Sequence, residues 1–442
     1  MLVKYLRLRL PQMNKAYCNY PWEHIYVHTT GHCKICCMSE DNITKDNGYS
    51  HFNTKNDNLL DVWNSKSIRE TRLKMLRGEK QSSCEKCYFA EDSGLTSMRD
   101  QHNFEVNAKN TQTDGSVNTK PTWLELHFGN VCNLACKMCS QMFSHTIGKE
   151  LLKIGKEDPD FLKWVKKESG LVNNWTGELD TVYDWFKIDK VKRSIFELVS
   201  QHVETLNIIG GEPTVIPEFF ELLEYCDQQN TLQKKTVTIC TNLTNTNPKL
   251  LRWLPKFKGF MIHASIDGLG DRNRYIRYPS NWNTIERSID FYKDACSNHT
   301  NGFISFAPAV QLLNIDQLVP LVEYFEKQSN ERDVVAWISH VRYPLICDYD
   351  YAPQSYRSRV ADNLENGIKR IQVKENANEI QSHVNHLRKE VNFDKGQISN
   401  VQKAFVRYND IQDNFRKDLK WRDLLPDLEK ELTESLSSYK IT

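Results

Sequence analysis

The sequence lacks a membrane-spanning segment, because no apolar run is long enough to cross a bilayer. Its first residues, MLVKYLRLRLPQ, are interrupted by Lys and Arg too often to form a signal peptide. The chain also lacks an excess of charge of either sign, since 58 Lys and Arg residues face 57 Asp and Glu residues. This balance argues against a protein that coats nucleic acid, although it allows a local basic groove. We therefore expect a cytoplasmic protein with no membrane partner and with no nucleic-acid partner.

Several other signatures are absent. The sequence contains no P-loop, no GxSxG motif and no short-period repeat, which excludes the simplest nucleotide hydrolase, serine hydrolase and solenoid readings. Disorder of the whole chain is also excluded, because 39% of the 442 residues are hydrophobic and 26% are charged. A chain of this length predicts two to three domains with a substantial core.

Cysteine is the residue present in excess. The chain has 13 cysteines, an odd number, and no export signal, so reduced metal-binding thiols are a better hypothesis than disulfides. Six of them lie in the first hundred residues, and three more form a tight group: Cys18, Cys33, Cys36, Cys37, Cys84 and Cys87, then Cys132, Cys136 and Cys139. The four scattered cysteines, Cys226, Cys240, Cys296 and Cys347, are typical of small buried hydrophobic residues.

The pattern along the chain predicts an N-terminal cysteine-rich domain over 1–106, a polar linker over 107–121, a core over 122–345 and a helical C-terminal extension over 346–442. Strand-like apolar runs recur at 123–128, 203–209, 236–240, 259–266, 303–310 and 334–341. Helical patterns separate most of them, so an α/β fold with a parallel sheet, open or barrel-shaped, is indicated. An aromatic-rich insertion occupies 140–202. Asn283, with Glu286 three residues later, is the expected N-cap of one helix.

The segment GNVCNLACKMCS directly follows the first core strand and contains Cys132, Cys136 and Cys139. Three thiolates on an iron–sulfur cube leave one iron without a protein ligand, as in a reactive metal site. Two alternatives stay open at this point. The three cysteines could bind zinc with His127 or His145 as the fourth ligand, or they could simply pack in the interior.

This segment resembles the C-x3-C-x-φ-C signature of radical S-adenosylmethionine (radical SAM) enzymes, which build a partial (β/α)6 barrel. The resemblance extends to Gly210-Gly211-Glu212-Pro213, which is similar to the GGEP motif whose backbone receives the SAM amino group. It also includes Ser265 and Asp267, which match the SxDG element at the ribose, and Arg277, which matches an arginine that pairs with the SAM carboxylate. Arg272 and Arg274 are neighbouring candidates for that role. Met138 stands at the position φ that packs on adenine, and Gln311 and Asn314 are expected near the adenine or the substrate.

The N-terminal cysteines follow the patterns C-x12-G-x4-C and C-x2-C, which bring two thiol pairs around one metal centre. They resemble the twitch, or truncated SPASM, domain that binds an auxiliary [4Fe–4S] cluster. Here this domain precedes the barrel. The expected ligands are Cys18, Cys36, Cys84 and Cys87, with Cys33 and Cys37 as competitors, and structural zinc is the alternative metal.

The resemblance implies an enzyme that binds SAM at a [4Fe–4S] cluster, receives one electron from an external donor and forms a 5′-deoxyadenosyl radical. It implies a peptide or protein as the substrate, with a nucleotide, sugar or small metabolite as the alternative. A noncatalytic iron–sulfur or zinc protein is the alternative of another class. The charge pattern of the C-terminal extension favours a solvated helix surface over a surface that grips a partner.

Overall fold

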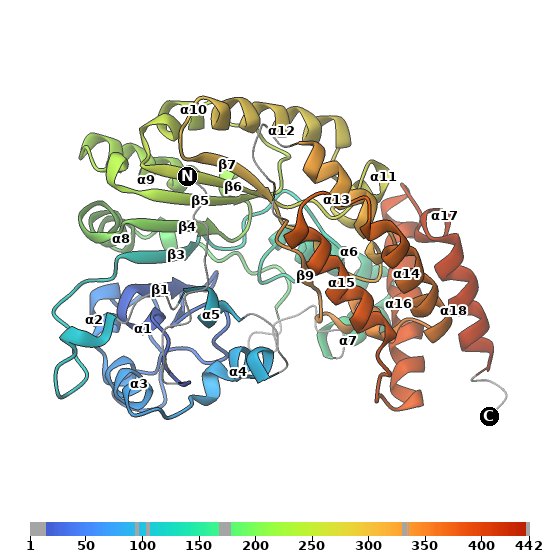
Figure 1. The fold of residues 1–442 in the computed structure, drawn as a ribbon, viewed down its shortest axis with the longest axis horizontal. Helices are drawn as coiled ribbons and strands as arrows, with labels where there is room; N and C mark the ends of the chain where they lie inside the picture. The colour runs from blue at the N-terminus through green and yellow to red at the C-terminus, as the bar shows by residue number, and fades with distance from the viewer. Residues whose placement is uncertain are drawn as a thin grey trace.

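The computed structural model describes residues 15–92, 97–102, 107–167, 178–328, 334 and 336–438 (Figure 1). Its strands are β1 (His24–Val27), β2 (Cys33–Lys34), β3 (Trp123–His127), β4 (Thr205–Ile209), β5 (Thr236–Thr241), β6 (Gly259–Ala264), β7 (Gly302–Phe306), β8 (Ala309–Val310) and β9 (Ser339–His340). Its α-helices are α1 (Tyr20–Glu23), α2 (Leu59–Trp63), α3 (Lys66–Leu76), α4 (Glu85–Asp92), α5 (Met98–His102), α6 (His145–Glu157), α7 (Pro159–Lys167), α8 (Asp189–His202), α9 (Pro217–Gln228), α10 (Leu250–Trp253), α11 (Asp271–Ile276), α12 (Trp282–Ser297), α13 (Leu318–Lys327), α14 (Gln354–Ile368), α15 (Lys374–Arg388), α16 (Lys395–Arg416), α17 (Trp421–Leu424) and α18 (Pro426–Ser438). Among these described residues, no helix combines the length and the apolar character needed to cross a membrane.

Strands β3 to β7 form a parallel sheet in which each strand pairs with the next one in the chain. Helices α8, α9, α10 and α12 lie along one side of this sheet (Figure 1). The face toward them carries matched apolar residues, of which Leu206, Val237 and Phe260 are paired across three neighbouring strands and fully buried. Burial of this row explains why the strands read as apolar runs. The predicted α/β class, with a parallel sheet and a helical C-terminal extension, is confirmed.

The opposite face of the sheet carries polar residues on its first core strands. It carries Glu125 on β3, Asn207 on β4 and Thr238 on β5, which occupy one row of the register. The carboxyl ends of these strands open toward the loops that contain the cysteine group, the glycine pair and the SxDG element. Function in open parallel sheets gathers at this end, because the loops that follow the strands meet there.

The N-terminal region joins the same sheet, which the sequence did not predict. Strand β1 pairs in parallel with β3, from His24 beside Trp123 to Val27 beside Leu126, and β2 extends the sheet beyond β1. The Trp185 indole N–H, from the insertion, donates to the Thr29 carbonyl at 2.9 Å. The cysteine-rich region and the core are therefore continuous in hydrogen bonding.

The prediction of a continuous sixth strand at 334–341 is wrong. Among the described residues of that range, Ala336 forms a single parallel bridge to Phe306, and only β9 forms a strand, paired with β8. The Trp337 N–H donates to the Phe306 carbonyl and the Ser339 N–H donates to the Pro308 carbonyl. Pro308 has no N–H of its own, so a regular ladder breaks at this point.

Two further segments differ from their sequence expectations. The polar segment 107–121 packs against helices α2 and α3 where it is described, since the Trp63 indole N–H donates to the Thr119 carbonyl at 2.7 Å. Helix α12 begins at Trp282, and its N-cap is Asn281, not Asn283. The Asn281 side chain accepts from the Thr284 N–H at 3.1 Å, because its extended backbone places it just outside the first turn.

Candidate active site and auxiliary cysteine site

The loop that contains Cys132, Cys136 and Cys139 connects β3 to α6 and is held by main-chain hydrogen bonds. The Ala135 N–H donates to the Tyr278 carbonyl at 2.6 Å, and the Lys137 N–H donates to the Ile276 carbonyl at 2.8 Å. Side chains at the start of α6 hold its first half, since the Thr146 hydroxyl donates to the Cys132 carbonyl and the Ser144 hydroxyl donates to the Leu134 carbonyl. The backbone that carries the three thiols is thus fixed before any ligand binds.

The glycine pair after β4 lies directly against this loop. Gly210 and Gly211 have φ angles of 82° and 53°, in the left-handed region that favours glycine. A Cβ atom on Gly211 would stand 2.1 Å from the Val131 carbonyl oxygen, and the Glu212 N–H donates to that same oxygen at 2.8 Å. Only glycine fits at this approach, so the turn next to Cys132 presents bare backbone, as the resemblance to GGEP predicts.

The Glu212 side chain connects the carboxyl ends of β4 and β5. Its carboxylate accepts from the Thr241 hydroxyl at 2.8 Å and from the Asn242 N–H at 2.7 Å, and it also accepts from the Thr214 hydroxyl and N–H. Burial raises the pKa of Glu212, and these hydrogen bonds oppose that effect. Pro213 begins the short 3-10 turn that follows. The glutamate of the motif therefore fixes the loops after β4 and β5 instead of reaching into open space.

Asp267 and Arg277, expected at two different parts of SAM, form an ion pair with each other. Arg277 Nε lies 2.7 Å from Asp267 Oδ2, both groups are nearly inaccessible, and the Ala309 N–H donates to Asp267 Oδ1 at 2.8 Å. Burial raises the pKa of Asp267, and the Arg277 charge lowers it. Arg272 is instead bound to Asp316 and to the Leu424 carbonyl, and Arg274 pairs with Asp418 at the surface. Of the three arginines, Arg277 is the one beside the cysteine loop.

The remaining predicted cofactor residues lie around the same strand ends. Ser265 is half-buried at the end of β6, whereas Met138 is partly buried and packs against the core. Asn314 is buried and donates to the Asp267 carbonyl at 2.9 Å, so it supports the loop. Gln311 is fully buried, and neither its side-chain oxygen nor its nitrogen has a hydrogen-bond partner. A ligand that enters here would satisfy the Gln311 amide.

Burial disfavours the thiolate forms of the three cysteines more strongly than nearby positive charge favours them. Burial raises the pKa of Cys132 to about 12, and it raises the pKa of Cys136 and Cys139 as well. Arg277 lowers the pKa of all three, and Arg416 also lowers that of Cys136. Thiols in this environment remain protonated until a metal centre displaces their protons.

The four expected auxiliary ligands line one cavity. Cys18 precedes α1 and Cys36 follows β2, whereas Cys84 ends a short 3-10 turn and Cys87 lies in the first turn of α4. All four border this cavity, together with Ile35, Tyr20 and Met75. The two competitors do not line it: Cys33 is fully buried within β2, and Cys37 lies next to the cavity residue Cys36. The geometry therefore favours the four predicted residues over Cys33 and Cys37.

Neither cysteine set has the compact spacing of four ligands around a single ion. Four thiolates around one tetrahedral ion with bonds of about 2.3 Å lie only about 3.8 Å apart. Among the described residues, only His340, Asp348 and Asp350 form a group of three or more ligand atoms that all lie within 4.8 Å of one another. No three thiols of the described residues meet that limit, so neither cysteine set has the compact arrangement of a single-ion site.

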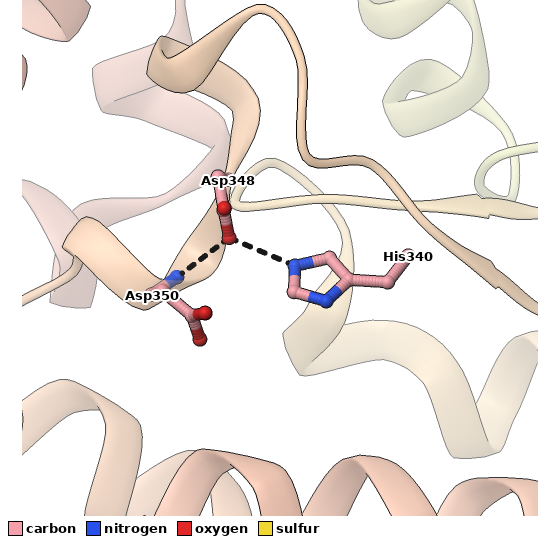
Figure 2. Close-up of side chains that lie close together, drawn as sticks. All are labelled: His340, Asp348 and Asp350. Atoms are coloured by element: carbon pink, nitrogen blue, oxygen red, sulfur yellow. Dashed lines mark hydrogen bonds and ion pairs between the residues drawn. The ribbon is translucent and has the colours of Figure 1, made fainter. Parts of the chain in front are cut away.

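The group His340, Asp348 and Asp350 is a satisfied hydrogen-bond network. Figure 2 shows Asp348 Oδ1 bonded to both the His340 ring, at 2.8 Å, and the Asp350 N–H, at 3.0 Å. Asp350 in turn binds His386 at 2.8 Å and Arg342 at 2.9 Å. Because cationic and N–H groups already occupy these carboxylates, the group ties β9 to α15 and offers no open metal site.

Sequence reasoning missed two sets of residues. Glu125 lies between His24, at 3.7 Å, and His127, at 3.3 Å; His24 bonds to the carbonyl of the cavity residue Ile35, and His127 packs under Gly210. A glutamate inside an apolar strand was the available signal. The second set, from helix α16, contacts the cysteine loop from 281 positions away, as Arg416 Nη2 donates to the Ala135 carbonyl. No local pattern signals such a contact.

Comparison with known proteins places both regions. Residues 126–324 match the family model of the radical SAM superfamily, and residues 18–88 match that of SPASM, an iron–sulfur cluster-binding domain. The mycofactocin maturase MftC of Mycobacterium ulcerans (strain Agy99) is 31% identical over 147 residues, which are 33% of this chain and 28% of that protein. The matched segment is thus under a third of the length of this curated relative.

Solved structures give a weaker likeness. Streptococcus suis SuiB aligns over 79% of this chain and 69% of its own, with 14% identity and a TM-score of 0.31. SuiB bound to the precursor peptide SuiA aligns over 78% and 68%, with 13% identity and a TM-score of 0.32. Both TM-scores are below 0.5. The two family matches contain the two cysteine sets, and the chain therefore belongs to the radical SAM superfamily, with a SPASM iron–sulfur domain ahead of its core.

Proposed function

We propose that this protein cleaves SAM reductively at a [4Fe–4S] cluster and abstracts a hydrogen atom from a peptide or protein. One observation carries the proposal: the three-cysteine loop is bonded to the Gly210–Gly211 turn on one side and to the segment that contains Arg277 on the other. Three separate parts of the sequence thus converge on one metal site. The two family matches imply three cofactors: a SAM-binding [4Fe–4S] cluster, SAM itself and an auxiliary iron–sulfur cluster.

In this proposal, different residues bind the cluster and the different parts of SAM. Cys132, Cys136 and Cys139 would hold the cluster and leave one iron without a protein ligand, where SAM would bind. The bare backbone at Gly210 and Gly211 receives the amino group, and the guanidinium of Arg277, fixed by Asp267, takes the carboxylate. Ser265, Met138 and Asn314 would bind the nucleoside part of SAM. When bound, the cluster and SAM supply a 5′-deoxyadenosyl radical, and the buried site keeps water from it.

The auxiliary cluster falls to Cys18, Cys36, Cys84 and Cys87, which border one cavity. An external one-electron donor supplies the electron for SAM cleavage, and we place the protein in the cytoplasm, where thiols stay reduced. The SPASM match and the likeness to a maturase support a peptide or protein substrate. Nothing in the near-neutral charge of the chain favours a nucleic-acid substrate.

Anoxic reconstitution tests this function. The protein is loaded with iron and sulfide, reduced with dithionite and given SAM, and 5′-deoxyadenosine and methionine are measured by liquid chromatography. We expect both products from the wild type, and a loss of at least about 100-fold in Cys136→Ala, because removal of one ligand opens the cluster. Cys226→Ala, which changes a buried cysteine on α9, is the matched control and should retain the activity.

A protein that takes up iron at both sites and yet forms no 5′-deoxyadenosine would contradict the proposal. It would then be a noncatalytic iron–sulfur protein. Uptake of zinc in place of iron at Cys136 would contradict it as well.

A further inference from the structure

The C-terminal end of α16 contacts the cysteine loop through a buried ionic network. Arg416 Nη2 donates to the Ala135 carbonyl at 2.7 Å, one position before Cys136. The same guanidinium pairs with Glu150 on α6 at 2.8 Å, and the Gln412 amide donates to that carboxylate at 2.9 Å. Arg416 and Glu150 are both almost inaccessible to solvent. One arginine therefore links three elements: the loop, α6 and α16.

Asp413 makes a second link one helical turn earlier, on the same face of α16. Its Oδ1 lies 3.3 Å from Lys137 Nζ and accepts from the Tyr275 hydroxyl at 2.9 Å. Its Oδ2 accepts from the Trp421 N–H at 2.8 Å, which fixes the carboxylate. Lys137 stands between two of the cysteines, and Tyr275 lies two residues before Arg277. Asp413 thus connects the metal loop to the arginine segment.

Aromatic rings complete the arrangement. The Lys137 ammonium lies 4.3 Å from the centre of the Tyr275 ring, and the Arg416 guanidinium lies 4.4 Å from that of Tyr278. The main chains of the two segments are also bonded directly, at Ala135 and Lys137. Each buried charge of this network has an oppositely charged partner, which a precise ligand loop needs because an unpaired charge there would be costly.

We propose that Arg416 and Asp413 are positioning residues that hold the loop of Cys132, Cys136 and Cys139 in the geometry that the SAM-binding cluster requires. The C-terminal extension is then a part of the active site, beyond the residues that match the radical SAM family model, which end at position 324. The inference rests on the proposed function for its SAM measurements. Its metal-binding measurements do not depend on that function.

The main test variant is the double substitution Glu150→Gln with Arg416→Gln, which removes the pair without leaving a buried charge. Asp413→Asn tests the second link. Arg416→Lys keeps the charge but loses the planar fork that bonds Glu150 and Ala135 together. Arg407→Gln is the control, because Arg407 lies on the same helix, is half exposed and pairs with Asp158 at 3.5 Å. Thermal unfolding of the metal-free proteins shows which variants fold.

The readouts are iron content, the electron paramagnetic resonance signal of the reduced cluster with and without SAM, and the rate of 5′-deoxyadenosine formation. We expect the double variant to unfold at a temperature close to that of the wild type and to lose about 10- to 100-fold in cluster affinity or SAM cleavage, as is typical for residues that orient metal ligands. The change that SAM produces in the resonance signal should disappear. Arg416→Lys should recover part of the rate, and Arg407→Gln should match the wild type.

Wild-type iron content together with a wild-type response to SAM in the double variant would overturn the positioning role. An equal loss in Arg407→Gln would also overturn it, since the effect would then belong to the helix surface. If the wild type itself cleaves no SAM, the proposed function fails, and the iron content of the variants still decides whether Arg416 positions the loop.

Discussion

The glycine pair after β4 shows how single residues prepare the site. Gly210 and Gly211 adopt positive φ angles, and a side chain at either position would collide with the loop that leads to Cys132 or with the strand beneath it. Glu212 and Asp267 do similar work through their carboxylates, which bond to backbone groups of neighbouring loops. The side chains of Glu212 and Asp267 therefore serve mainly to fix loop backbones, and their carboxylates are already hydrogen-bonded within the protein.

Gly211→Ala should destabilise the protein and impair cluster assembly. The strain of a left-handed alanine alone costs about 1 kcal/mol. The collision with the Val131 carbonyl should bring the loss in unfolding free energy above about 2 kcal/mol. Gly48→Ala is the control, since Gly48 also has a positive φ, of 80°, but a Cβ atom there meets nothing within 4 Å. Urea denaturation measures both variants, and equal losses would show that the close approach is unimportant.

At the scale of elements, the auxiliary site depends on short pieces that are far apart in sequence. Cys84 and Cys87 come from one helical segment around α4, whereas Cys18 and Cys36 flank α1, β1 and β2. None of these elements is long enough to be stable alone, so the site and the surrounding small helices depend on one another. The site also borders the core sheet, through His24 and its contacts with Ile35 and Glu125.

The double variant Cys84→Ala with Cys87→Ala should separate the two metal sites. We expect the iron content to fall by about four atoms per chain, since one cube loses two of its ligands. Formation of 5′-deoxyadenosine without substrate should continue, and modification of the peptide or protein substrate should stop. The double variant Cys226→Ala with Cys296→Ala removes the same number of thiols elsewhere and should retain both activities. Loss of SAM cleavage together with the iron would instead indicate a folding role.

At the scale of the whole molecule, one sheet and one helix hold the parts together. Strand β1 extends the core sheet at β3, and α16 reaches the metal loop from the other end of the chain. The core then contains many buried polar groups, among them histidines whose rings stay neutral. Burial lowers the pKa of His28 and His383 to about 3 and that of His263 to about 4.

These histidines predict acid sensitivity of the metal-free protein. Their pKa in the unfolded chain is about 6.5. Above that pH both states are neutral and the stability is complete; as the pH falls below it, the unfolded chain binds protons that the folded protein does not, so the free energy of unfolding decreases. Urea denaturation at about pH 7.5 and at about pH 5.5 should show the decrease. His263→Gln should reduce it, and equal stability at both pH values would contradict the prediction.

The sequence by itself determined the class of fold and the two sets of clustered cysteines. Thiol spacing, a glycine pair after a strand and alternating strand and helix patterns are local features, because ligand loops and sheet-forming runs are set by neighbouring residues. They predicted the three-cysteine loop, the four-cysteine set and the parallel sheet. Local features also misled at Asn283 and at the sixth strand, where Asn281 and Pro308 decided the outcome.

Only the tertiary structure decided how distant parts complete the site. The pairing of β1 with β3, the ion pair between Asp267 and Arg277, and the contact of Arg416 with Ala135 join residues that are separated along the chain. Such contacts leave no periodic signal, since a buried charge is specified by its partner across space and not by its neighbours in sequence. For that reason the sequence of the C-terminal extension indicates a solvated surface, although its helix α16 ends at Arg416, which contacts the loop of Cys132, Cys136 and Cys139.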